Sequence, residues 1–81
     1  MLMDRRTRRR IEKMDLSRRQ VYVETVEQEL QRAREKHRRL LFAFQRTPHT
    51  ELRGFQKRRL NRLERQVKTL TQIIEYAQRT A

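Results

Sequence analysis

Residues 45–54 read QRTPHTELRG and contain the only proline and the only glycine of an 81-residue chain. Proline disrupts a helix interior but is accepted in a first turn, so this stretch separates two helices. Thr47 is the expected N-cap of a second helix that begins at Pro48, and Thr50 is the alternative cap. Because short connections join antiparallel neighbours, the stretch predicts an all-α helical hairpin.

On both sides of this break, apolar residues recur at the spacing of three and four that is typical of a helix. The first set is Val23, Val26, Leu30, Ala33, His37, Leu40 and Phe44, and the second is Leu60, Leu63, Val67, Leu70, Ile74, Ala77 and Ala81. The period is close to that of a coiled coil, so the two stripes should face each other along one seam. We expect helices at about 17–45 and 48–80, with His37 as a polar seam residue that specifies register.

The N-terminal residues 1–16 are expected to form a basic arm outside this hairpin, which then comprises residues 17–81. In the register that pairs Leu30 with Val67, Ala81 lies near Leu16, so nothing stands opposite the arm and it should project as an overhang. Ser17 and Gln20 have the spacing of a capping box, which predicts a helix start at Ser17. Whether the arm is itself helical is left open.

The hairpin has a narrow seam, and two helices alone bury little apolar surface. Four apolar residues flank the seam and would widen it: Val21, Leu41, Ile73 and Tyr76. A four-helix bundle made of two hairpins would bury them, so a homodimer is a possible partner state.

The net charge is +12, and arginine supplies 18 of the 22 basic residues. The charge falls in two blocks, with eight basic and three acidic residues in 1–20, and eight and two in 46–68. The arginine side chain is suited to phosphate pairing and base stacking, so the expected partner is nucleic acid. The candidate contacts are Arg5, Arg6, Arg8, Arg9, Arg10 and Lys13 in the arm, and Arg58, Arg62, Arg65 and Lys68 on the outer face of the second helix. The spacing does not distinguish single-stranded DNA, duplex DNA and RNA.

A second kind of surface is expected on the first helix, whose outer face mixes acidic, amide and basic side chains. Candidate contacts to a protein partner are Glu24, Gln28 and Gln31, together with Phe42, which falls on the outward side. The remaining phenylalanines, Phe44 and Phe55, are expected to close the hairpin tip as an apolar cap. The alternative function is therefore a helical adaptor or assembly subunit that binds an acidic protein surface or a ribonucleoprotein.

Composition argues against several other classes of protein. The chain has no cysteine, its two histidines cannot hold a metal alone, and neither has a nucleophile or carboxylate arranged for catalysis. We therefore expect no enzyme, no metal and no cofactor. The longest apolar run, Leu40–Phe44, is too short to cross a bilayer, so a bacterial-type cytoplasm or nucleoid is favoured, with organelle import left open.

One family resemblance covers about two-thirds of the chain. It is carried by Val26–Leu30 and the arginine-rich stretch after it, then Gln45, Thr47, His49 and Glu51, Phe55, Arg59–Arg62, and Ile74–Glu75. In these positions the chain resembles the C-terminal helical region of the primosomal replication-restart accessory proteins of the N double-prime type. The resemblance implies single-stranded DNA binding, with contacts to single-strand-binding protein and the replicative helicase, in DNA replication or restart.

Overall fold

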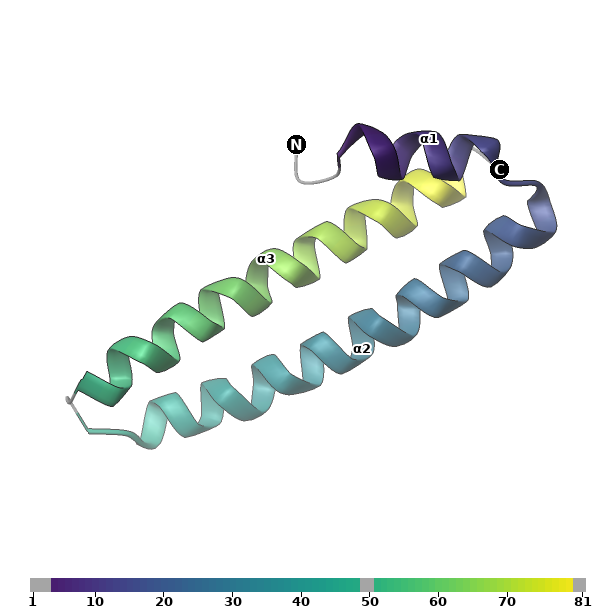
Figure 1. Cartoon of the computed structure of the whole chain (residues 1–81). Helices are drawn as coiled ribbons and strands as arrows, with labels where there is room; N and C mark the ends of the chain where they lie inside the picture. Colours follow the sequence, from purple (N-terminus) through teal and green to yellow (C-terminus); the bar gives the residue numbers. More distant parts are fainter. Residues whose placement is uncertain (1–3, 49–50, 80–81) are drawn as a thin grey trace.

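The computed structural model describes residues 4–48 and 51–79, and within them every regular element is helical. The helices are α1 (Arg5–Lys13), α2 (Leu16–Arg46) and α3 (Glu51–Arg79). Helices α2 and α3 run antiparallel as the two long arms of a hairpin, and α1 lies across the end of α3 farthest from the connecting loop (Figure 1). The predicted all-α hairpin is confirmed.

The seam between α2 and α3 is formed by the two apolar stripes. Val26, Leu30 and Ala33 of α2 are buried in one cluster with Leu70 of α3, and Val67 and Ile74 are packed against it, partly buried. None of the described stripe residues is exposed, so the inward face of both helices was predicted correctly. His37 is half-buried, with Nε2 3.4 Å from Glu64 Oε1, a weak contact between α2 and α3.

The end of α2 differs from the prediction. Thr47 closes α2 as its C-cap, since its N–H donates to Phe44 O at 3.2 Å and its hydroxyl donates to Ala43 O at 2.8 Å. A residue before proline avoids the helical region, and Thr47 is extended, with φ −82° and ψ 128°. The expected role of Thr47 as an N-cap is therefore wrong, and Thr50, the alternative cap, lies outside the described residues.

The start of α2 also differs from the prediction, because a second helix precedes it. Asp4 caps α1, its Oδ1 accepting from Thr7 N at 2.8 Å. Met14 then leaves the helical region with ψ 138°, and Asp15 caps α2 by accepting from Arg18 N at 2.8 Å. The helix therefore starts at Leu16 with Asp15 as its cap, and not at Ser17.

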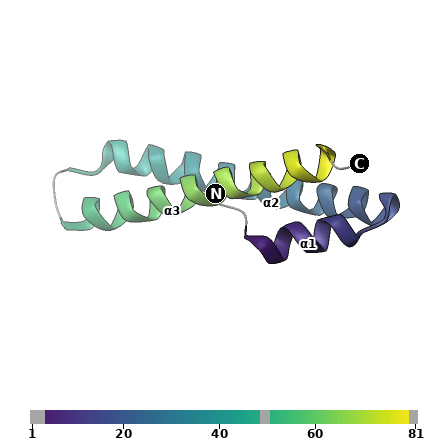
Figure 2. The same cartoon turned by 90° about the horizontal axis from the view of Figure 1, so that it is seen from above.

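Helix α1 folds back onto the hairpin, so the expected overhang is wrong. Ile11 of α1 and Ala77 of α3 are both 0 % exposed, and Ile73 and Tyr76 pack against them together with Tyr22 and Val23 of α2. The physical reason is burial: a projecting arm would leave the Ile11 side chain and these flanking apolar residues in water. Seen from above, α1 lies on one side of the hairpin (Figure 2).

Polar contacts hold α1 in this position. Arg19 Nη2 of α2 donates to Ile11 O at 3.0 Å and to Met14 O at 3.3 Å, and so satisfies carbonyls at the C-terminal end of α1. The Tyr76 hydroxyl donates to the Glu12 carboxylate, and the Arg8 guanidinium lies 5.6 Å from the centre of the Tyr76 ring. The middle and the C-terminal end of α1 are thus tied to the hairpin, which makes it an integral third helix.

The docked helix changes which apolar residues remain open. Ile73 and Tyr76, expected to serve a dimer, are covered by α1, while Val21 is 63 % exposed and Leu41 38 % exposed. In the described part of the chain, no helix combines the length and the apolar character needed to cross a membrane.

We expect Ile11→Ala to release α1 while leaving the α2–α3 hairpin folded. Truncating a buried isoleucine costs about 2–5 kcal/mol, which raises the undocked population tenfold or more. Trypsin should then cleave within residues 5–13 at least tenfold faster. Val21→Ala, a truncation at an exposed position, is the control and should cleave at the wild-type rate; equal rates for the two variants would contradict the docked arrangement.

The Tyr76 hydroxyl, at the contact between α1 and α3, provides a second test. The hydrogen bond to Glu12 raises the pKa of Tyr76 above its ordinary value of about 10, and desolvation adds to it. A raised folded pKa means that this stabilisation of α1 docking is present below about pH 10 and is lost as pH rises through the folded value. In a Tyr22→Phe background, Glu12→Ala should lower the pKa of Tyr76 toward 10 in a tyrosinate absorbance titration. Glu75→Ala should leave the pKa of Tyr76 unchanged. If Glu12→Ala also leaves it unchanged, the hydrogen bond between Tyr76 and Glu12 does not form in solution.

Candidate nucleic-acid interface

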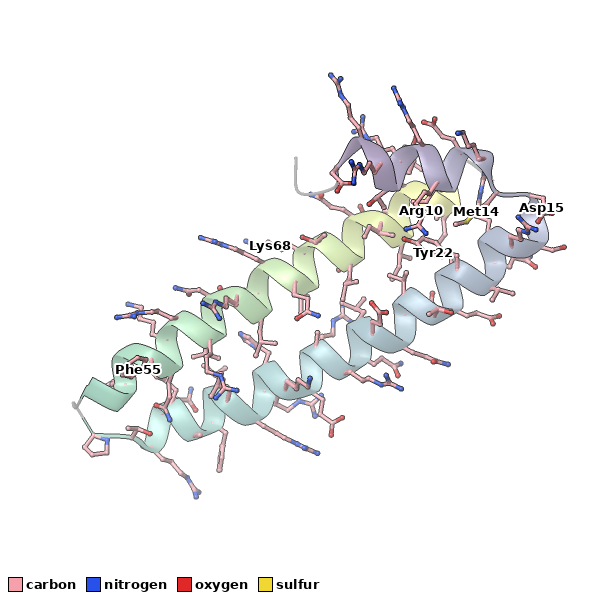
Figure 3. All side chains as sticks on the ribbon, in the orientation of Figure 1. Arg10, Met14, Asp15, Tyr22, Phe55 and Lys68 are labelled. Atoms are coloured by element: carbon pink, nitrogen blue, oxygen red, sulfur yellow. The ribbon has the colours of Figure 1, made fainter. Side chains whose placement is uncertain are left out.

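Helix α1 presents most of its basic residues to solvent. The exposed ones are Arg5, Arg6, Arg9, Arg10 and Lys13. Arg8 is the exception among the predicted arm contacts, because it is half-buried and lies over the Tyr76 ring. Figure 3 shows Arg10 and Met14 at the junction with Tyr22, and burial raises the pKa of that tyrosine while the charge of Arg10 lowers it. The arm is therefore an ordered helix with one cationic face and one packed face.

Three predicted contacts of α3 lie on the same side of the hairpin as α1. Arg58, Arg62 and Arg65 are exposed, and continuing their spacing of three or four residues leads through Thr69 to Ile73 and Tyr76. Ile73 and Tyr76 are the residues that α1 covers. We call this face, with α1 at one end and Arg58 at the other, the α1 side. It joins the two basic blocks, which residues 21–45 separate in the sequence.

A groove of about 630 Å³ lies between α2 and α3 on the α1 side, nearer the loop. Its lining is Lys36, Arg39, Leu40 and Ala43 from α2, and Arg59, Arg62, Leu63 and Gln66 from α3. The groove thus has four cations on its rim, apolar side chains on its floor and no acidic residue among those that line it. Arg39 Nη2 is bound to Glu35 Oε1 at 2.8 Å, so the uncompensated charge rests mainly on Lys36, Arg59 and Arg62.

An exposed aromatic ring stands at the loop end of this groove. Phe55 is 58 % exposed, and the Arg58 guanidinium lies 5.4 Å from its ring centre. Phe55, Arg59 and Arg62 share one side of α3 by their spacing, and Figure 3 shows Phe55 near the start of that helix. The expected tip cap is therefore wrong for Phe55, whereas Phe44 is half-buried with Arg53 over its ring at 4.6 Å.

The other predicted contacts lie elsewhere. Lys68 lines a groove on the opposite flank of the seam with Arg34, His37 and Glu64. Glu24 and Gln31 line two further grooves on that flank, and Gln28 is exposed. Phe42 is 56 % exposed and carries the Arg46 guanidinium 4.1 Å from its ring centre, as its outward position requires. We call this flank the open side, because α1 does not cover it.

Sequence analysis missed Lys36, Arg39 and Arg59. The first two belong to a helix of mixed charge and lie between the two basic blocks, and Arg59 falls close to the apolar stripe of α3. Heptad position tells how far a residue lies from the seam. To assign residues of two helices to one groove, one must also know which flank of α2 lies beside which flank of α3. The docking of α1 identifies those flanks through Tyr22, Ile73 and Tyr76.

Within residues 4–48 and 51–79, no three histidine or carboxylate side chains are grouped as a metal ion would need. The arrangement offers positive charge, an apolar groove floor and an exposed aromatic ring. Together these give a helical protein whose α1 side is strongly cationic.

Comparison with known proteins returned no matching family model, no matching curated protein and no matching solved structure. The resemblance to the replication-restart accessory proteins therefore stays a prediction.

Proposed function

We propose that this protein is a non-enzymatic nucleic-acid-binding protein that contacts phosphates through the α1 side. The observation that carries the proposal is the groove rimmed by Lys36, Arg39, Arg59 and Arg62, which continues toward the exposed arginines of α1. From Arg62 to Ile73, where α1 begins to cover α3, is about 16 Å along the helix. A polyanion lying along this face would meet the groove cations at one end and the α1 cations at the other.

Arginine chemistry and the local aromatic ring favour a nucleic acid over a generic anion. Guanidinium groups pair with phosphate oxygens in a fixed fork, and phosphate neutralisation releases condensed counterions. The apolar floor of Leu40, Ala43 and Leu63, and the open ring of Phe55, offer surfaces on which a base can lie. The proposal assigns no base specificity.

The groove cations can be tested against cations elsewhere on the surface. Lys36→Gln/Arg59→Gln/Arg62→Gln should weaken binding to single-stranded DNA, duplex DNA and RNA probes. It should also flatten the slope of log affinity against log salt by about 0.7–0.9 per lost phosphate contact. Arg34→Gln/Lys57→Gln/Lys68→Gln removes the same charge, also from one position of α2 and two of α3, but from outside the α1 side, since Arg34 and Lys68 line a groove on the open side. Assayed at a protein concentration that keeps the chain monomeric, it should keep the wild-type slope.

Equal slopes for both triple variants would place the contact outside the groove. Binding of polyglutamate with the affinity and salt slope of the nucleic-acid probes would instead favour the adaptor function, in which the same face meets an acidic protein.

Phe55 and Phe42 form a matched pair for testing base stacking, because they are similarly exposed and each has an arginine over its ring. Phe55→Ala should weaken binding to a single-stranded probe by about 1–3 kcal/mol, the usual loss for one stacked base, and leave duplex binding unchanged. Phe42→Ala, on the open side, should change neither when binding is measured at a protein concentration that keeps the chain monomeric. An equal loss for duplex and single strand would assign Phe55 a structural role instead.

A further inference from the structure

The open side of α2 carries a second regular stripe that the seam does not use. It consists of Leu16, Gln20, Glu24, Glu27, Gln31, Arg34, Arg38 and Leu41, spaced by three or four residues throughout. All eight are exposed, and Leu16 is exposed to 60 % despite being apolar. We call this the open stripe. Helix residues with such spacing form one continuous face, which here has no partner within the described chain.

The open stripe is polarised along its length. The half nearer α1 has the carboxylates Glu24 and Glu27, and the half nearer the loop has the cations Arg34 and Arg38. Each half ends in apolar side chains, Leu16 at one end and Leu41 with the adjacent, 56 % exposed Phe42 at the other. When two copies of the open stripe lie antiparallel, the acidic half of each therefore faces the basic half of the other, and the apolar ends also face each other.

We infer that the open side binds a second copy of this chain, with the two α2 helices antiparallel about a two-fold axis at the level of residue 29. This register places Glu24 opposite Arg34 of the second copy and Glu27 opposite Gln31. It places Gln20 opposite Arg38, and Leu16 opposite Phe42. Each contact occurs twice, as an isologous interface requires. The inference extends the possible homodimer to a face and an orientation, and it does not depend on nucleic-acid binding.

Grooves along the open side give the second helix a place to pack. One is lined by Leu16, Val23 and Ala77 with polar residues, and the next by Leu30 and Ile74 with Glu27, Gln31 and Arg34. The floors of these grooves are the edge of the seam. A helix lying over them would therefore cover apolar surface on the open side, as α1 does on the opposite side. A parallel second copy would instead oppose Glu24 to Glu24 and Arg34 to Arg34, which like-charge repulsion disfavours.

The net charge of +12 does not prevent this pairing. The antiparallel arrangement leaves both α1 sides pointing outward, with two layers of helix between them. The molecule, α1 included, measures 50 × 21 × 14 Å, so the two outward cationic faces of a dimer are separated by more than the Debye length of about 8 Å at physiological salt. The charges that meet at the interface are the complementary ones.

Charge reversal tests the orientation. Glu24→Arg/Glu27→Arg makes the stripe wholly basic, and Arg34→Glu/Arg38→Glu makes it wholly acidic. In sedimentation velocity at low ionic strength, the wild type should dimerise reversibly, and each variant alone should self-associate at least tenfold more weakly. Mixed in equal amounts, the two variants should form a heterodimer, and the quadruple reversal in one chain should restore the homodimer. Far-UV circular dichroism checks that each variant keeps its helices, as exposed positions allow.

Cross-linking provides an independent readout, because the natural chain has no cysteine. A Gln20→Cys chain mixed with an Arg38→Cys chain should be joined by a short bis-maleimide. Gln20→Cys alone should not, because the two copies of residue 20 would lie about 27 Å apart along the helices. A monomeric wild type, failure of the two charge variants to pair, or cross-linking of Gln20→Cys with itself would overturn the inference.

Discussion

The burial of Ile11 against Ala77 is the contact on which the rest of the surface depends. A two-helix hairpin is symmetric in its exposure, because both flanks of its seam are open to water. Docking α1 removes that symmetry by covering Tyr22, Ile73 and Tyr76 on one flank only. The reversal of the chain at Met14–Asp15 makes this docking possible. Arg19 stabilises the reversal because its guanidinium donates to the carbonyl oxygens of Ile11 and Met14.

From this asymmetry follows a division of charge. The cations of α1, the Arg58–Arg65 stripe and the four-cation groove share the α1 side, while Glu24, Glu27, Glu64 and Glu75 line grooves on the open side. A bulk charge of +12 distributed evenly would give only solubility and weak attraction. The cations that gather on the α1 side beside an apolar groove floor offer both attraction and a surface for contact.

The hairpin and its seam could be predicted from the sequence because period and chain break are local signals. The Leu30 and Leu70 stripes repeat without interruption, and Pro48 stops the first helix in a single step. The arm could not be predicted in the same way. Asp15 and Ser17 are both favourable caps, and the choice between them depends on whether Ile11 finds a buried site, which is a tertiary property. The groove has the same origin: Lys36 and Arg59 meet only once the adjoining flanks are known.

The two proposed surfaces support each other physically, although each stands on its own evidence. An antiparallel dimer through the open stripe would point two α1 sides in opposite directions, so one dimer could engage two segments of nucleic acid or two turns of one. Linked sites of this kind raise apparent affinity without any new contact, since the second binding event is intramolecular. A bound polyanion would in turn neutralise the outward cations and remove the remaining repulsion between copies. Binding and dimerisation would then be reciprocally coupled, because each lowers the electrostatic free energy of the other.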